Sequence, residues 1–192
     1  MSITYYNEHA TTFAEGTLSV DMQSLYQRFL PLLPAGAHIV DAGCGAGRDA
    51  RYFLQQGFAV SAFDGSEQLA ALASEVTGQP VQVCRFDQFV APAPVDAIWA
   101  CASLLHVPAA ELPVVLAHLS QQLVSGGLFY CSFKYGCGEV SRDGRDFTNL
   151  DEDGLQQMLD NLPLAVADCW QTGDLRPGRE AERWLNAILR KV

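Results

Sequence analysis

The chain has 192 residues, of which 49% are hydrophobic, and its formal net charge at neutral pH is −10. This length supports one sizeable core but is short for two, so we expect a single domain over residues 1–192. The acidic balance argues against a nucleic-acid partner. The sequence has no apolar run of roughly 18 residues and no signal-peptide pattern, which predicts a soluble, cytoplasmic protein with no membrane partner, either a monomer or a homodimer.

Residues 1–16 are polar with aromatic insertions and show no steady period, so we expect an ordered N-terminal arm or a lid. The core is expected over residues 17–192. From Thr17, apolar residues recur every three or four positions as far as Leu33, which predicts an amphipathic helix closed by Pro34, Ala35 and Gly36.

The stretch from Val40 to Asp49 follows an apolar run suited to a buried strand and precedes a helical pattern that includes Phe53 and Leu54. Glycines occupy alternate positions 43, 45 and 47. Glycine permits positive φ and leaves no Cβ between the backbone and a ligand. In a parallel α/β sheet this turn faces the crevice beyond the carboxyl ends of the strands, so we expect a flat, extended ligand there.

Strand and helix patterns then alternate along the chain. The predicted strands cover residues 58–63, 81–84, 95–100 and 128–133, and the helices between them begin at Ser66 and after Pro108. Residues 134–149 form the longest irregular stretch, which favours a functional loop. After a helix capped by Asp151 or Asn149, strands at 164–171 and 183–191 are separated by a short turn, which allows only an antiparallel pair. The pattern predicts a doubly wound parallel sheet with one reversed strand.

Six cysteines are spread along the sequence, with no C-x-x-C pair and no grouping with histidine at metal-ligand spacing. We therefore predict reduced, buried thiols and no metal site. A reducing compartment agrees with this pattern.

Motifs at the ends of successive strands resemble those of class I methyltransferases that use S-adenosylmethionine (SAM). The resemblance rests on Asp41-Ala-Gly-Cys-Gly-Ala-Gly, on Asp64 at the end of the second strand, on Phe86-Asp87, on Leu105-His-Val-Pro, and on Leu123-Val-Ser-Gly-Gly. It implies a Rossmann-like seven-stranded sheet in the order 3-2-1-4-5-7-6 with strand 7 antiparallel. Within the class, the chain is most similar to small bacterial single-domain enzymes, including the tellurite-resistance type.

The chemistry of SAM suggests a partner for each part of the cofactor. The helix that starts near Arg48 offers N–H groups and a dipole to the methionine carboxylate, and Asp64 is placed to accept two hydrogen bonds from the ribose diol. The resemblance implies that Asp41 faces the ammonium side and that Asp87 reaches the adenine. The predicted cofactor-binding residues are Tyr6, Asp41, Gly43, Cys44, Gly45, Gly47, Arg48, Asp64, Gly65, Ser66, Phe86, Asp87, Gln88, Ala100 and Cys101.

Structural alternatives remain open at three of these positions. Arg48 also fits an exposed or sheet-covering arginine, Asp41 a turn-capping carboxylate, and Asp87 a loop-capping carboxylate. For Asp41 the two roles are compatible.

Methyl transfer from a sulfonium is an in-line displacement, so alignment of the nucleophile supplies much of the catalysis and a general base is optional. His106 is the candidate base, because it follows the fourth strand at the crevice and its ordinary pKa lies near neutrality. The alternative is a packed or capping histidine. Tyr5, Tyr6 and His9 are expected to form a lid that excludes water from the sulfonium.

The acceptor is expected to be a small molecule, because the sequence contains neither an Asn-Pro-Pro-Tyr motif nor a Pro-Cys nucleophile. Seven of the twelve basic residues fall after residue 140, which suits an anionic acceptor, although ordinary surface charge explains them equally well. They are Arg142, Arg145, Arg176, Arg179, Arg183, Arg190 and Lys191.

Two other functions fit part of the pattern. A nicotinamide-dependent oxidoreductase also needs a glycine turn and an acid after the second strand, but its fingerprint is G-x-G-x-x-G and this chain has G-x-G-x-G. A SAM-binding module without catalysis is the other alternative, and the sequence alone does not separate it from an enzyme.

Overall fold

The computed structural model describes residues 2–179 and 181–192, and it contains a seven-stranded sheet in the order β3-β2-β1-β4-β5-β9-β8. All neighbouring strands are parallel except β9, which runs antiparallel to β5 and to β8. The strands are β1 (His38–Ala42), β2 (Ala59–Asp64), β3 (Gln82–Val83), β4 (Val95–Ala100), β5 (Leu123–Lys134), β8 (Leu164–Gly173) and β9 (Arg183–Lys191). The predicted order is confirmed, with β8 and β9 as its sixth and seventh strands.

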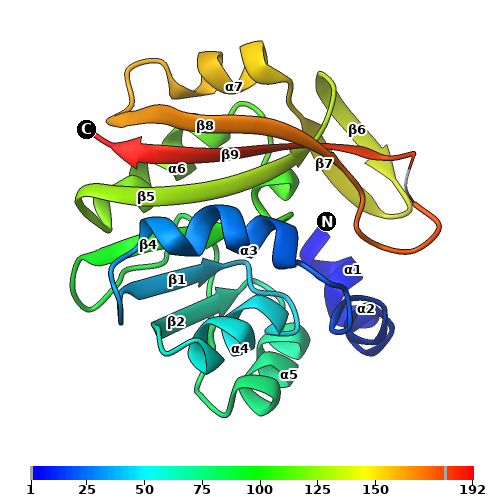
Figure 1. Ribbon diagram of the computed structural model, residues 1–192. Coiled ribbons are helices and arrows are strands. Elements are labelled where there is room, and N and C mark those ends of the chain that lie inside the picture. Colours follow the sequence, from blue (N-terminus) through cyan, green and yellow to red (C-terminus); the bar gives the residue numbers. More distant parts are fainter. Residues whose placement is uncertain (1, 180) are drawn as a thin grey trace.

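Helices cover both faces of this sheet (Figure 1). Side chains alternate along β1, so that Ile39 packs with the helices of one face and Val40 with those of the other. The first face is covered by α3 (Gln23–Phe29), which continues as a short 3-10 turn at Leu30–Leu32, and by α4 (Arg48–Gln55). The second is covered by α6 (Leu112–Gln121) and α7 (Glu152–Leu159).

Local sequence signals set the ends of several helices. Ser66 caps α5 (Glu67–Thr77) by accepting a hydrogen bond from the Leu69 N–H, and Gly78 ends it in the left-handed conformation. Asp151 caps α7 in the same way through Gly154. These caps agree with the sequence-based expectation.

The N-terminal segment forms two short helices, α1 (Ser2–Glu8) and α2 (Ala10–Thr17). The helix that was predicted to begin at Thr17 begins only at Gln23, and its predicted start is therefore wrong. Leu18 instead follows α2, and its side chain packs beside Phe13 and Leu72 rather than on the central sheet. The N-terminal helices lie at one side of the molecule (Figure 1).

Residues 134–149, predicted as an irregular loop, contain a second, two-stranded sheet. Its strands are β6 (Gly138–Arg142) and β7 (Arg145–Asn149). The turn between them is Asp143-Gly144, and both residues have positive φ, of 51° and 74°. This is the dipeptide that favours a two-residue hairpin turn. The sequence therefore carried a hairpin signal that the loop interpretation missed.

No helix in the described part of the chain is long and apolar enough to cross a membrane. Within the same residues, no three histidine, cysteine or acidic side chains gather as metal ligands would. The cysteines are unpaired, but only Cys131 is fully buried and Cys137 is exposed, so the expectation of buried thiols holds only in part.

Candidate functional site

Two adjoining pockets open at the carboxyl ends of β1, β2 and β4. We call them the acidic pocket, lined by Asp64, Asp87, Glu111, Glu139 and Asp146 among others, and the basic pocket, lined by Arg48, Lys134, Arg142, Arg145, Arg176 and Arg179 among others. Eight residues line both pockets and form the junction between them: Tyr6, Phe13, Gly43, Gly45, Ala102, Leu105, His106 and Phe147. The site is therefore one continuous cleft with two chemically different ends.

The glycine turn lies at this junction. Gly43, Gly45 and Gly47 have φ values of 71°, 56° and 83°, as predicted, and only glycine adopts such values without strain. Close packing within the chain is a second reason for the missing Cβ, beside the expected approach of a ligand. A Cβ on Gly43 would lie 2.6 Å from the Cβ of Ser103, and one on Gly45 would lie 3.1 Å from the Phe13 ring. The turn is thus packed closely by other parts of the chain as well as open to the cleft.

Asp64 ties the glycine turn to the turn after β2. One carboxylate oxygen accepts a hydrogen bond from the Gly45 N–H at 2.9 Å, and the other accepts one from the Ser66 N–H at 2.8 Å. Burial raises the pKa of Asp64 to about 6, although these two hydrogen bonds act in the opposite direction. Each oxygen retains a further lone pair for a ligand hydroxyl in the acidic pocket.

Asp41 is 2% exposed and accepts a hydrogen bond from the Ala50 N–H, in the first turn of α4, at 2.9 Å. This contact is the turn-capping role that the sequence left open. Burial, followed by the charge of Asp49, raises the pKa of Asp41 well above its ordinary value. Because Asp41 also lines the basic pocket, a ligand role remains compatible with the capping role.

Asp49 is the centre of a buried polar network that sequence reasoning missed. Its carboxylate accepts hydrogen bonds from the Tyr26 hydroxyl at 2.5 Å and from the indole N–H of Trp99 at 2.8 Å. It also binds the adjacent Arg48 guanidinium through Nε at 2.6 Å and Nη2 at 3.0 Å. Burial, the largest single effect, would raise the pKa of Asp49, but the charge of Arg48 and the hydrogen bonds from Arg48, Tyr26 and Trp99 together hold that pKa below its ordinary value.

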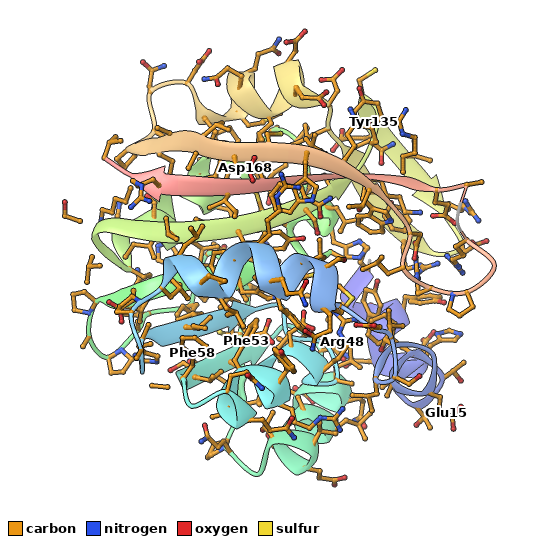
Figure 2. The ribbon with its side chains drawn as sticks, viewed as in Figure 1. Glu15, Arg48, Phe53, Phe58, Tyr135 and Asp168 are labelled. Carbon is orange, nitrogen blue, oxygen red and sulfur yellow. The ribbon has the colours of Figure 1, made fainter. Side chains whose placement is uncertain are left out.

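This network explains why a cation is tolerated in the first turn of α4. Asp49 supplies the negative charge that the helix dipole favours at this end, and it holds the guanidinium of Arg48 at the wall of the basic pocket. Figure 2 labels Arg48, which lies toward the side of the molecule that carries the N-terminal helices. A ligand carboxylate at Arg48 would therefore meet a guanidinium that is already paired.

His106 lies at the junction, on a short 3-10 turn (Leu104–His106) after β4. Its Nδ1 lies 2.8 Å from the Asp146 carbonyl oxygen, which only accepts hydrogen bonds, so the proton of the neutral ring resides on Nδ1. Its Nε2 then accepts a hydrogen bond from the Tyr6 hydroxyl at 2.8 Å. Burial lowers the pKa of His106 from its ordinary value near neutrality to about 4, so the ring is neutral at pH 7.

The N-terminal helices reach the cleft through several side chains. Tyr6 and Phe13 line the junction, and their rings pack edge to face with centroids 5.1 Å apart. Asn7 accepts a hydrogen bond from the Ser66 hydroxyl at 2.7 Å, which fixes the arm to the start of α5. Phe13 was missed by sequence reasoning, because nothing in the local pattern places it over a turn that lies 30 residues later.

The structure brings most of the predicted site residues to the cleft. The acidic pocket receives Asp64, Gly65, Phe86 and Asp87, the basic pocket receives Asp41, Cys44, Arg48 and Cys101, and both receive Tyr6, Gly43, Gly45 and His106. Four predicted residues line neither pocket: Gly47, Ser66, Gln88 and Ala100. Burial raises the pKa of Cys101 to about 12, so its thiol stays protonated and is a poor nucleophile.

The four residues away from the pockets have structural contacts. A Cβ on Gly47 would lie 3.1 Å from the backbone of Ala73, so this glycine permits close packing of α4 against α5. Ser66 caps α5, and the Gln88 side-chain oxygen accepts a hydrogen bond from the Arg85 N–H at 3.2 Å. The side chain of Ala100 is fully buried in the core.

Comparison with known proteins places this site in a family. A family model described as "Methyltransferase domain" matches residues 13–167, which is more than half of the chain. Among curated proteins, none matches the sequence.

Solved structures share the fold at low sequence identity. The 1,6-didemethyltoxoflavin-N1-methyltransferase of Burkholderia thailandensis, with bound 1,6-didemethyltoxoflavin and S-adenosylhomocysteine (SAH), has a TM-score of 0.78 and 21% identity, over 100% of this chain and 85% of that one. Magnesium protoporphyrin IX methyltransferase from Synechocystis PCC 6803, with bound SAH, has a TM-score of 0.77 and 16% identity, over 100% and 98%. A TehB-like SAM-dependent methyltransferase from Corynebacterium glutamicum has a TM-score of 0.75 and 18% identity, over 96% and 99%.

Proposed function

This chain belongs to the methyltransferase domain family, and we propose that it transfers a methyl group from SAM to a small-molecule acceptor. The observation that carries this proposal is the continuous cleft at the glycine turn. The acidic pocket at one end holds the carboxylate of Asp64, which suits a ribose, and the basic pocket at the other end holds cationic side chains. The junction between the two pockets is lined by aromatic rings. Structural neighbours that bind SAH at the same fold support it.

We place the adenosine of SAM in the acidic pocket. Asp64 would accept hydrogen bonds from the two ribose hydroxyls, since it lines that pocket and is fixed by two backbone N–H groups. Phe86 would cover the adenine ring and Asp87 would accept from its amino group. The methionine end would then extend past Gly43 and Gly45 toward Arg48, Asp41 and the backbone at Cys101.

The sulfonium would lie at the junction, under Tyr6 and Phe13. An aromatic face attracts a sulfonium through its negative quadrupole, and a closed arm excludes the water that would compete for the methyl group. We therefore propose that residues 1–16 act as a lid. The contacts of Tyr6 with His106 and of Asn7 with Ser66 support a closed position of this lid over the site.

The proposed role of His106 is to receive a proton at Nε2, either from the acceptor or through the Tyr6 hydroxyl. With a pKa of about 4, the ring is a weak base. It suits only a strongly acidic donor, such as the protonated ether oxygen that is formed when a neutral hydroxyl group has received the methyl group. Alignment of the acceptor in the junction would then supply most of the rate enhancement.

We propose that the acceptor is anionic, because six basic side chains line the pocket opposite the adenosine site. The structural neighbours named above act on 1,6-didemethyltoxoflavin and on magnesium protoporphyrin IX, which are small molecules, and this supports a small acceptor here. Which atom receives the methyl group depends on how the acceptor sits between these cations and the junction.

The experiment is a calorimetric titration with SAM, SAH and NADH, followed by a screen of small-molecule acceptors in which SAH and the methylated product are both measured. We expect SAM and SAH to bind with similar affinity and NADH to show no binding. Binding of NADH without any response to SAM would contradict the proposal. Binding of SAM without turnover across a broad acceptor panel would favour a SAM-binding module.

A further inference from the structure

We propose that Arg145 is the anchor that selects the acceptor, and that it holds a carboxylate or a similar planar oxyanion of that acceptor. This inference rests on the proposed function and names the substrate class for the same cleft. It is carried by the guanidinium of Arg145, which lies on β7 at the wall of the basic pocket.

Arg145 is held in place by aromatic side chains. Its guanidinium carbon lies 4.6 Å from the centroid of the Tyr5 ring and 5.4 Å from that of Phe147. Its side chain is only 17% exposed, although it carries a full charge. A guanidinium held between rings keeps its fork of donors in a fixed direction, which is the arrangement that binds a planar oxyanion in two-point fashion.

The charge of Arg145 is poorly compensated. Its nearest carboxylate among the described residues is Asp143, at 3.9 Å from Nη2, and that carboxylate is 64% exposed and also pairs with Arg142 at 3.3 Å. The Nε–H of Arg145 is buried and has no hydrogen-bond partner among the described residues. A buried donor without an acceptor is costly, so this geometry favours a ligand that supplies one.

Other cations of the basic pocket are paired more closely. Arg176 binds Asp174 through Nε at 2.9 Å and through a second short contact at 2.5 Å. Lys134 lies 2.9 Å from a Glu182 oxygen, and Arg48 is bound by Asp49 at 2.6 Å. Arg145 therefore differs from these cations in having capacity left for an external anion.

The position of Arg145 connects this anion site to the proposed site of transfer. Burial raises the pKa of the Tyr6 hydroxyl above its ordinary value, and a hydrogen bond and the charge from Arg145 act in the opposite direction. Asp146, the next residue along β7, presents the carbonyl that orients His106. The acceptor would thus reach the junction with its anionic group on Arg145 and its reacting atom near the Tyr6 hydroxyl and His106.

The anion site is built from parts outside the central sheet. Tyr5 is on α1, Arg145 and Phe147 are on the β6–β7 hairpin, and the Ser2 hydroxyl accepts a hydrogen bond from the Asp146 N–H at 3.2 Å. Figure 1 shows the N-terminal helices and the hairpin on the same side of the molecule. The central sheet would then hold the cofactor, while the N-terminal helices and the β6–β7 hairpin together would determine which acceptor binds.

The test compares benzoate with benzamide, two probes of the same shape that differ in charge, by calorimetry on the SAH-saturated protein. We expect benzoate to bind at least about tenfold more tightly than benzamide, and Arg145→Gln to remove this preference. Arg145→Lys, which keeps the charge, should retain part of it. Circular dichroism and the melting temperature confirm that each variant is folded.

Arg28→Gln is the matched control. Arg28 also stacks on an aromatic ring, with its guanidinium carbon 4.2 Å from the centroid of Trp170, and pairs with Asp168 at 3.0 Å, but it lines neither pocket. This variant should keep the full preference for benzoate. Figure 2 labels Asp168, which lies on β8 and away from the N-terminal helices.

Equal binding of the two probes by the unaltered protein would overturn the anchor, and so would a preference that survives in Arg145→Gln. The comparison of benzoate with benzamide is also run without SAH, so that the role of Arg145 is tested whether or not SAH binds. If SAH fails to bind, the proposed cofactor is wrong, and the probe comparison still decides the role of Arg145.

Discussion

Replacement of Asp64 by asparagine gives the most direct test of the proposed cofactor site. The carboxylate provides two oxygens, each of which accepts a backbone N–H and has a further lone pair for a ribose hydroxyl. An amide provides only one acceptor oxygen and no charge. Hydrogen bonds to a charged group are stronger than neutral ones by about 1 kcal/mol each, so the loss across two ribose bonds is about 2 kcal/mol, or roughly 30-fold in SAM affinity.

The same carboxylate predicts how SAM affinity varies with pH. With a pKa of about 6 in the protein without ligand, Asp64 is mostly ionised at pH 7 and mostly protonated at pH 5. Because the ribose hydroxyls donate to the ionised form, affinity should fall about tenfold between these two pH values. In Asp64→Asn this dependence should be absent, and the two proteins should converge toward pH 5.

Isothermal titration calorimetry with SAM at pH 5, 6 and 7 measures both effects. Asp151→Asn is the control, because Asp151 accepts a backbone N–H from Gly154 in a comparable turn but lies outside both pockets. It should leave SAM affinity unchanged. An affinity that is flat from pH 5 to pH 7 in the unaltered protein, or equal in Asp64→Asn, would refute the assignment of the ribose to this carboxylate.

The effect of Asp64 on folding has the opposite sign. Its pKa is raised from 3.8 in the unfolded reference to about 6 in the fold, so the folded state holds this proton more tightly than the unfolded chain does. Its contribution to stability is therefore present below pH 3.8 and falls as the pH rises through about 6. Ligand binding and folding thus respond to pH in opposite directions through one group.

Three further predictions concern the buried network, the junction and the arm. Tyr26→Phe removes one hydrogen-bond donor to the buried carboxylate of Asp49, and it should lower the free energy of unfolding in urea titrations by about 1.5–3 kcal/mol. Tyr52→Phe is the control, because it loses only an exposed 3.3 Å contact and should cost less than about 0.5 kcal/mol. Equal costs would contradict the stabilising role of the Asp49 network. With an acceptor that the protein methylates, His106→Gln should lower turnover at least about tenfold and change the affinity for SAM little. Unchanged turnover would contradict the proposed role of His106 as the proton acceptor. Deletion of residues 1–14 should weaken SAM binding in calorimetry, because it takes Tyr6 and Phe13 away from the junction. An unchanged affinity for SAM would contradict the proposal that this segment acts as a lid.

The sequence by itself determined the kind of sheet and the turn that organises the site. Alternation of strand and helix patterns, with a short link only between the last two strands, predicts a parallel sheet with one reversed strand, and the structure has this arrangement. The order of the strands was implied by the resemblance to class I methyltransferases, and it is also observed. Positive φ at Gly43, Gly45 and Gly47 follows from local backbone sterics, and Ser66 and Asp151 cap helices through contacts three residues away. These features are local, so they can be read from neighbouring residues.

Only the tertiary structure decided what surrounds that turn. Phe13 lies over Gly45, Tyr6 meets His106 across 100 residues of sequence, and Asp49 gathers Tyr26 and Trp99 from two other elements. Such contacts depend on how helices pack on the sheet, and no short-range pattern encodes them.

The pKa values were decided in the same way. Burial moves that of His106 to about 4 and that of Asp64 to about 6, and burial is a property of the whole fold. The β6–β7 hairpin, which carries Arg145, has one feature that the sequence predicts and one that only the fold decides. Its Asp143-Gly144 turn is local and readable, but the placement of the guanidinium between Tyr5 and Phe147 required the folded chain.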